Sequence, residues 1–87
     1  MASYSLAFKK SVATDLRGIP NRDVKRILKR IDSLCENPRA EGSIKLSGQE
    51  RYRVRQGVYR IVYEILNTEL MVLVIKVAHR SEAYKSS

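Results

Sequence analysis

Three arginines lie close together in a predicted β-hairpin, and their type and spacing suit them to chemistry on an anion. The segment YRVRQGVYRIVY at positions 52–63 contains Arg53, Arg55 and Arg60. These arginines alternate with apolar side chains, and that period of two predicts two half-buried strands. Arginine binds phosphate oxygens through two parallel hydrogen bonds and stays charged. The hairpin is therefore a candidate phosphate-binding element.

The turn determines which side chains of the hairpin face each other. With Gly57-Val58 as a two-residue turn, Arg55 faces Arg60 and Arg53 faces Val62. The same register pairs Gln56 with Tyr59, and Val54 with Ile61. Like charges directly opposite each other on a sheet are destabilising. At ~5 Å their repulsion is roughly 1 kcal/mol even with water-like screening. We therefore expect a bound polyanion, rather than the fold, to account for this arrangement.

The chain as a whole is small and basic. Its 87 residues suffice for one domain, spanning 1–87, and its 17 Lys and Arg against nine Asp and Glu give a net charge of +8. This charge favours a nucleic-acid partner, although a small basic domain is also compatible with no such role. The longest apolar run, residues 70–75, is too short to cross a membrane. The amino terminus lacks a signal-peptide pattern, and the lone Cys35 fits a small buried hydrophobe. We expect a cytoplasmic protein without membrane contact.

Apolar periodicity predicts one strand and two helices in the first half of the chain. Residues 3–8 alternate as a strand, and residues 9–17 form a helix that ends at Gly18. A second helix opens at Pro20-Asn21, with Asn21 as its N-cap, and stops before Asn37-Pro38. Its apolar stripe is Val24, Ile27, Leu28, Ile31, Leu34 and Cys35. Its opposite face is strongly basic, which indicates either a solvated surface or a phosphate-binding one.

Three strands follow in the second half, at about residues 51–56, 59–66 and 70–78, with a short edge strand possible at Lys45-Leu46. The last strand is nearly all apolar, so we expect a central strand with both faces covered. The predicted fold class is α+β with the order β-α-α-β-β-β. A helical hairpin packs on one face of a mainly antiparallel sheet.

Conventional catalytic and metal-binding patterns are missing from the sequence. It has one Cys, one His and no phosphate-binding glycine-rich loop, and Glu64 is as suited to pairing with a basic neighbour as to catalysis. The remaining candidates stand at strand ends. If the strand order brings the chain end back to the hairpin, one concave positive surface holds Arg53, Arg55, Arg60, His79, Arg80 and Tyr84. Such a surface suits a phosphodiester and its transition state. Without metal or cofactor, the obvious nucleophile is RNA's own 2′-hydroxyl. The alternatives are a surface role for His79 and a core-capping role for Tyr84.

These residues resemble a known family. The pattern KLSG, three residues, then YRVRQGVYRIVYEI, an apolar strand and AHRSEAY is similar to the RelE family of toxins in the RelE/ParE superfamily. The amino-terminal YSLAFKKSVATDLRGIP and the later CENPRAEGSIKL fit the same family, so the resemblance covers nearly the whole chain.

The resemblance implies a ribosome-dependent mRNA endonuclease that an antitoxin holds inactive. Such toxins cut the codon in the ribosomal A site, where the 2′-hydroxyl attacks the adjacent phosphate. The family's functional positions map by motif to Arg53, Arg55, Arg60, Arg80 and Tyr84.

One departure from the family changes the expected roles. The best-known member has lysines where this chain has Arg53 and Arg55. Lysine can be tuned toward a general base, whereas arginine stays protonated. We therefore expect these arginines to bind phosphate, with His79 as the candidate base because its ordinary pKa lies near neutrality. Tyr84 would orient or stack a base. Arg80 would act either as proton donor to the leaving oxygen or as its electrostatic stabiliser.

Further basic residues are candidates for contact with ribosomal RNA phosphates. They are Lys25, Arg26, Lys29 and Arg30 on the second helix, together with Lys45 and Arg51. The partner protein implied by the resemblance is an acidic antitoxin, extended or helical, and DNA would be contacted only through the toxin–antitoxin complex.

Two rival functions remain open. A ParE-like toxin that poisons DNA gyrase would share the fold, although the HRSEAY ending and the paired Arg53 and Arg55 favour the ribonuclease. A non-catalytic basic binding module would account for the charge and leave the opposition of Arg55 and Arg60 to affinity alone.

Overall fold

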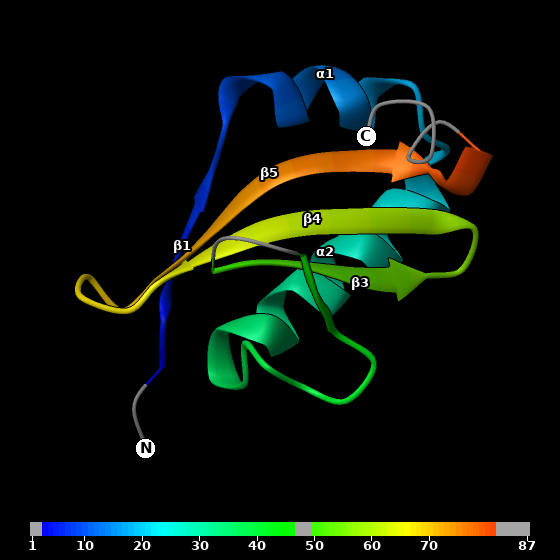
Figure 1. The fold of residues 1–87 in the computed structure, drawn as a ribbon. Helices are drawn as coiled ribbons and strands as arrows, with labels where there is room; N and C mark the ends of the chain where they lie inside the picture. Colours follow the sequence, from blue (N-terminus) through cyan, green and yellow to red (C-terminus); the bar gives the residue numbers. More distant parts are fainter. Residues whose placement is uncertain (1–2, 47–49, 82–87) are drawn as a thin grey trace.

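Two helices pack on one face of a five-stranded sheet, in which the strand order is β1-β5-β4-β3-β2 (Figure 1). The structure, a computed structural model, describes residues 3–46 and 50–81, so the predicted site residue Tyr84 lies outside the described residues. The elements are β1 (Ser5–Phe8), α1 (Lys10–Arg17), α2 (Asn21–Glu36), β2 (Ile44–Leu46), β3 (Arg51–Gln56), β4 (Tyr59–Leu66) and β5 (Met71–His79). Only the contact of β1 with β5 is parallel. The predicted α+β fold is confirmed, and the short edge strand exists as β2.

The helix α2 buries one apolar stripe against the sheet. Ile27, Ile31 and Leu34 of this stripe are fully buried in the core. The helix begins one residue earlier than predicted, because Pro20 occupies the N-cap position and makes no side-chain capping bond. The Pro20 carbonyl instead accepts the backbone N–H groups of Asp23 and Val24 at 2.9 and 3.0 Å. The prediction of Asn21 as N-cap is therefore wrong.

The hairpin of β3 and β4 has the predicted register. Arg55 pairs with Arg60 and Arg53 with Val62, and the other two predicted pairs also form. Gly57 in the turn has φ 61°, a left-handed conformation that costs glycine little. Side chains alternate between the two faces of the strands. The hairpin therefore presents Val54 and Ile61 to the helices and the arginines to the opposite, open face.

β5 is an internal strand as predicted, between β1 and β4, but only one of its faces is covered by helices. Val72, Val74 and Val77 are buried in the core beneath them. Met71 and Leu73 alternate with Val72 and Val74, so they face the side of the sheet without a described helix, where both are half-buried. The prediction that both faces are covered is wrong, since α1 and α2 pack on the same side.

Among the strands that the structure describes, only β4 lies beside the second half of β5. β1 pairs with β5 from Met71 to Val74 and then ends at Phe8. Beyond that point the Asp15 carboxylate of α1 accepts the Val77 backbone N–H at 3.1 Å. Asp15 thereby replaces one hydrogen bond that a further strand residue would have made. On the other side, β4 continues along β5 as far as the pair Tyr59 and His79.

In the middle of β4, the buried Tyr63 is hydrogen-bonded to the loop after α2. Its hydroxyl donates a 2.6 Å hydrogen bond to the Pro38 carbonyl, and its ring stacks on Tyr52 with centroids 5.9 Å apart. Burial raises the pKa of the Tyr63 hydroxyl above its usual value.

Cys35 packs against the core but is half-buried, less than the buried position predicted, and burial raises the pKa of its thiol. None of the helices in the described part of the chain combines the length and apolar character needed to cross a membrane.

Candidate functional site

Arg55, Arg60 and Arg80 line one cavity of about 310 Å³, together with Gly57. They come from β3, the start of β4 and the residue directly after β5. The sheet order places these three segments side by side, because β4 lies between β3 and β5. The strand order on which the predicted cluster depended is therefore present for these three arginines.

Backbone pairing holds Arg80 in this place. Its N–H donates to the Val58 carbonyl in the hairpin turn at 2.7 Å. The preceding residues are paired with β4, since Ala78 lies opposite Arg60. β5 ends at His79, and the Arg80 side chain reaches the open face, because it lines one cavity with Arg55 and Arg60.

The three guanidinium groups differ in exposure. Arg60 is 4% exposed, whereas Arg55 and Arg80 are exposed. Burying a cation carries a desolvation cost that ordinary surface arginines avoid. Positive charge concentrated around one small cavity fits an anion, and a bridging phosphate would reduce the repulsion between Arg55 and Arg60.

Arg53 is half-buried on the same face, but it does not line this cavity. It lies one two-residue step along β3 from Arg55, a spacing of about 7 Å. Its neighbours across the sheet are Val62 on β4 and Ile44 on β2. This position suits contact with the next phosphate of a strand rather than with the same one.

Arg51 continues the row of arginines along β3 and is engaged within the protein. Its Nη2 and Nε donate to one Glu64 carboxylate oxygen at 2.7 and 3.3 Å. Glu64 is therefore a charge partner for the neighbouring strand, one of the two roles that the sequence left open. This ion pair leaves Arg51 less available to RNA than the arginines near the turn.

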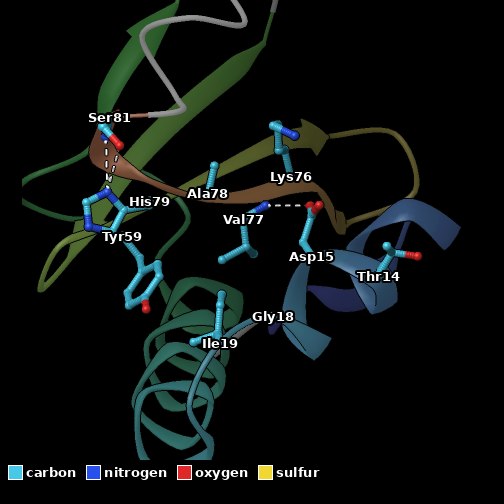
Figure 2. Close-up of a pocket in the computed structure, with 10 residues that line it drawn as sticks. All are labelled: Thr14, Asp15, Gly18, Ile19, Tyr59, Lys76, Val77, Ala78, His79 and Ser81. Carbon is cyan, nitrogen blue, oxygen red and sulfur yellow. Dashed lines mark hydrogen bonds between the residues drawn. The ribbon is translucent and has the colours of Figure 1, made fainter.

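The structure does not bring His79 together with the arginines. His79 pairs with Tyr59 on β4, and both side chains face the helix side of the sheet. There it lines a different cavity, shown in Figure 2, where its ring stands edge-on to Tyr59. Its Nδ1 accepts the Ser81 backbone N–H at 3.3 Å and lies 3.0 Å from the Ser81 hydroxyl.

The basic residues predicted to meet ribosomal RNA have different surroundings. Lys25, Arg26 and Lys29 are exposed on α2. Arg30 is half-buried, and its Nη2 donates to the Glu41 carbonyl at 3.4 Å. Lys45 lies on the helix side of β2, 3.9 Å from the Glu50 carboxylate. The exposed trio is therefore best placed for an external polyanion.

Across the part of the chain that the structure describes, no group of three or more His, Cys, Asp and Glu side chains gathers into a possible metal site.

Comparisons with known proteins identify a matching family and several relatives of this chain. The family described as "ParE toxin of type II toxin-antitoxin system, parDE" matches residues 6–84. The putative toxin RelE1 of Methanocaldococcus jannaschii is 31% identical over 87 residues, covering 95% of this chain and 97% of the relative. The chain belongs to the RelE family of toxins in the RelE/ParE superfamily. The mRNA interferase toxin RelE of Escherichia coli is 28% identical over 90 residues, covering 98% and 94% of the two chains.

Solved RelE structures share the fold. The archaeal RelE–RelB complex from Pyrococcus horikoshii matches with a TM-score of 0.81 at 27% identity, covering 90% of this chain and 96% of that chain. The isolated E. coli RelE toxin matches with a TM-score of 0.78 at 27% identity, covering 97% and 98%. The protein is thus a RelE-like toxin of a type II toxin–antitoxin system.

The sequence did not predict a site role for Asp15 of α1 or Tyr59 of β4, which line the cavity at the end of β5. Asp15 binds a backbone N–H that is 62 positions away, and no local pattern signals such a contact. Tyr59 alternates with the core residues and therefore reads as one of them, although it also borders a cavity.

Proposed function

We propose that this RelE-like toxin is a ribosome-dependent mRNA endonuclease that cuts the A-site codon. The observation that carries the proposal is the convergence of Arg55, Arg60 and Arg80 on one cavity. Two further facts support it. The chain belongs to the RelE family, and the E. coli relative is named an mRNA interferase toxin.

The arginines would act on the scissile phosphate through charge. Arg55 and Arg60 bind its non-bridging oxygens, and Arg80 lies across the cavity, where it stabilises charge on the leaving 5′-oxygen. The nucleophile is the adjacent 2′-hydroxyl of the RNA, so no bound metal is needed. Removing one such donor typically slows the chemical step about 10²- to 10³-fold. Arg53 positions the strand through a neighbouring phosphate, and Tyr84 is the proposed contact for a base.

Proton transfer needs a group other than His79 in the described arrangement. The His79 ring lies on the helix side of the sheet, away from the cavity that the arginines line. Arginine does not deprotonate in proteins. We propose that the cluster works by alignment and charge stabilisation, with water or a ribosomal group accepting the proton.

The ribosome is proposed as partner because the exposed basic residues occupy two sides of the molecule. The arginine cavity opens on the uncovered face of the sheet, whereas Lys25 and Lys29 are exposed on α2, which packs on the other face (Figure 1). Arg26 lies beside the hairpin turn, because it lines a cavity with Gln56, Gly57 and Val58. A message on one side and ribosomal RNA on the other would engage both, with the helix contacts positioning the toxin without reading sequence.

An acidic antitoxin is proposed as the inhibitor. A chain with a net charge of +8 favours an acidic partner through long-range attraction. The P. horikoshii relative was solved as a RelE–RelB complex. We propose the cytoplasm as the location of this protein, because the ribosomes on which it would act are there.

The test is to induce the toxin in cells, map transcript 5′ ends and assay DNA breaks in the same cultures. Codon-phased cuts within translated regions should appear and should vanish in Arg80→Ala. Arg17→Ala is the matched control, because it removes an exposed arginine from α1, outside the proposed cluster. Gyrase-linked DNA breaks with intact messages would instead indicate the ParE-like function. Binding of nucleic acid without cuts or breaks would indicate the non-catalytic module.

A further inference from the structure

A second cavity of about 580 Å³ lies on the helix side of the sheet, between the end of α1 and the end of β5 (Figure 2). It is larger than the arginine cavity, and no step of the proposed RNA cleavage uses it. Its lining residues are Thr14, Asp15, Gly18, Ile19, Tyr59, Lys76, Val77, Ala78, His79 and Ser81. A volume of this size is typical of sites for small organic ligands.

One wall of the cavity is a strand edge without a neighbouring strand. β1 pairs with β5 only as far as Val74, and among the described strands none continues on that side. The Val77 N–H points to this side, because it donates to Asp15. The Arg80 N–H points to the other side, because it donates to Val58.

These two contacts fix the direction of the groups between them. Backbone N–H and C=O groups alternate along a strand, residue by residue. The Val77 carbonyl and the His79 N–H therefore both face the cavity. They present one acceptor and one donor side by side, two residues apart on the same edge.

We infer that this cavity binds a nucleobase that carries an amino group next to an unprotonated ring nitrogen, namely adenine or cytosine. The amino group donates to the Val77 carbonyl, and the ring nitrogen accepts the His79 N–H. The Ile19 side chain and the Tyr59 ring border the same space, as Figure 2 shows, and give the base an apolar and aromatic surface.

Other lining groups suit the rest of a nucleotide. Asp15 uses Oδ2 for Val77, so its second carboxylate oxygen is available to accept a sugar hydroxyl. The Ser81 N–H occupies the His79 Nδ1, which places the ring proton on Nε2 as a further donor.

The inference does not depend on RNA cleavage, because the cavity and the arginines lie on opposite faces of the sheet. The test is a titration of the His79 backbone amide, followed by NMR, with adenosine monophosphate. Inosine monophosphate is the matched ligand, because it presents a protonated ring nitrogen and a carbonyl in place of the required pair. We expect saturation with a dissociation constant of about 1 mM or lower for adenosine monophosphate, and binding at least about tenfold weaker for inosine monophosphate.

Variants make the site assignment specific. Thr14→Trp places a bulky ring into the cavity from an exposed position on α1, and it should abolish the response. Ser11→Trp adds the same ring at an exposed position of α1 that does not line the cavity, and it should leave the response unchanged. No saturable shift, equal binding of the two nucleotides, or unchanged binding in Thr14→Trp would each overturn the inference.

The same titration identifies the source of the base. A non-cleavable deoxy-trinucleotide that binds more tightly than the mononucleotide, and loses this gain in Arg55→Ala, indicates a base of the RNA strand held by the arginines. Equal affinity of the trinucleotide and the mononucleotide, unchanged in Arg55→Ala, indicates a free nucleotide. Either result supports a base site in this cavity.

Discussion

Arg55 and Arg60 lie directly opposite each other on β3 and β4, and the side chain of Arg80 borders the same cavity from the end of β5. Two cations in register on neighbouring strands weaken a sheet, so the arrangement is better suited to binding than to folding. A phosphate bound at the proposed site would explain why the sheet carries this repulsion and why the two arginines lie beside a tight turn.

Replacing Arg55 should therefore stabilise the fold while it impairs function. We expect Arg55→Thr to raise the free energy of unfolding by up to about 1 kcal/mol, because the repulsion from Arg60 is removed and threonine favours strands. RNA cutting should fall about 10²-fold or more. Urea denaturation and a cleavage assay measure the two effects. Arg53→Thr is the control, since Arg53 faces Val62, and it should give no comparable gain. A loss of stability in Arg55→Thr would contradict this account of the pair.

The ion pair of Arg51 and Glu64 should matter for stability more than for cutting. Both side chains are partly exposed, at 38% and 23%, so we expect a coupling free energy of about 0.5–1 kcal/mol. A double-mutant cycle with Arg51→Ala and Glu64→Ala measures it in urea. Cutting should change only a few-fold in Arg51→Ala. A loss as large as that of Arg80→Ala would place Arg51 in the site instead.

Stability should fall in alkaline solution because of Tyr63. Burial raises the pKa of its hydroxyl in the folded state above the unfolded value of about 10. Its contribution is therefore fully present below pH 10 and is lost as the pH rises through the folded-state pKa. Tyr63→Phe removes the bond to Pro38 and should cost about 1 kcal/mol at pH 7. Urea denaturation between pH 7 and pH 11 should show a weaker alkaline loss in this variant. An identical pH profile in both proteins would exclude Tyr63 as the cause.

Asp15 should hold the end of β5 through its hydrogen bond to Val77. Asp15→Ala removes the acceptor and should speed hydrogen exchange at the Val77 amide about tenfold or more, because a bond to a carboxylate typically stabilises by about 1.5–3 kcal/mol. Asp15→Asn keeps a carbonyl acceptor and should retain most of the protection. If the Val77 amide exchanges at the same rate in both variants, other contacts protect this edge of β5.

The hairpin and its register were predictable because a period of two and a Gly57 turn are local signals. The position of His79 was not, because it depends on where β5 ends. The strand continues through His79, which lines the cavity on the helix side, whereas Arg80 directly after it lines the arginine cavity. The register shift between Val62 and Tyr63 against β5 likewise has no signature in the sequence. Local patterns therefore predicted the pairing of Arg55 with Arg60, while the approach of Arg80 and the cavity near Asp15 needed the tertiary structure.

The most direct test of the proposed function uses purified ribosomes programmed with a defined message. We predict that the wild-type toxin cuts the A-site codon and leaves a 2′,3′-cyclic phosphate (or 3′-phosphate) and a 5′-hydroxyl. A message with a single 2′-deoxynucleotide at the attacking position should stay intact. Arg80→Ala should lose about 10²-fold or more of the cutting rate, while Arg17→Ala keeps it. Cutting of the deoxy-substituted message at the same bond, or full activity in Arg80→Ala, would contradict the account.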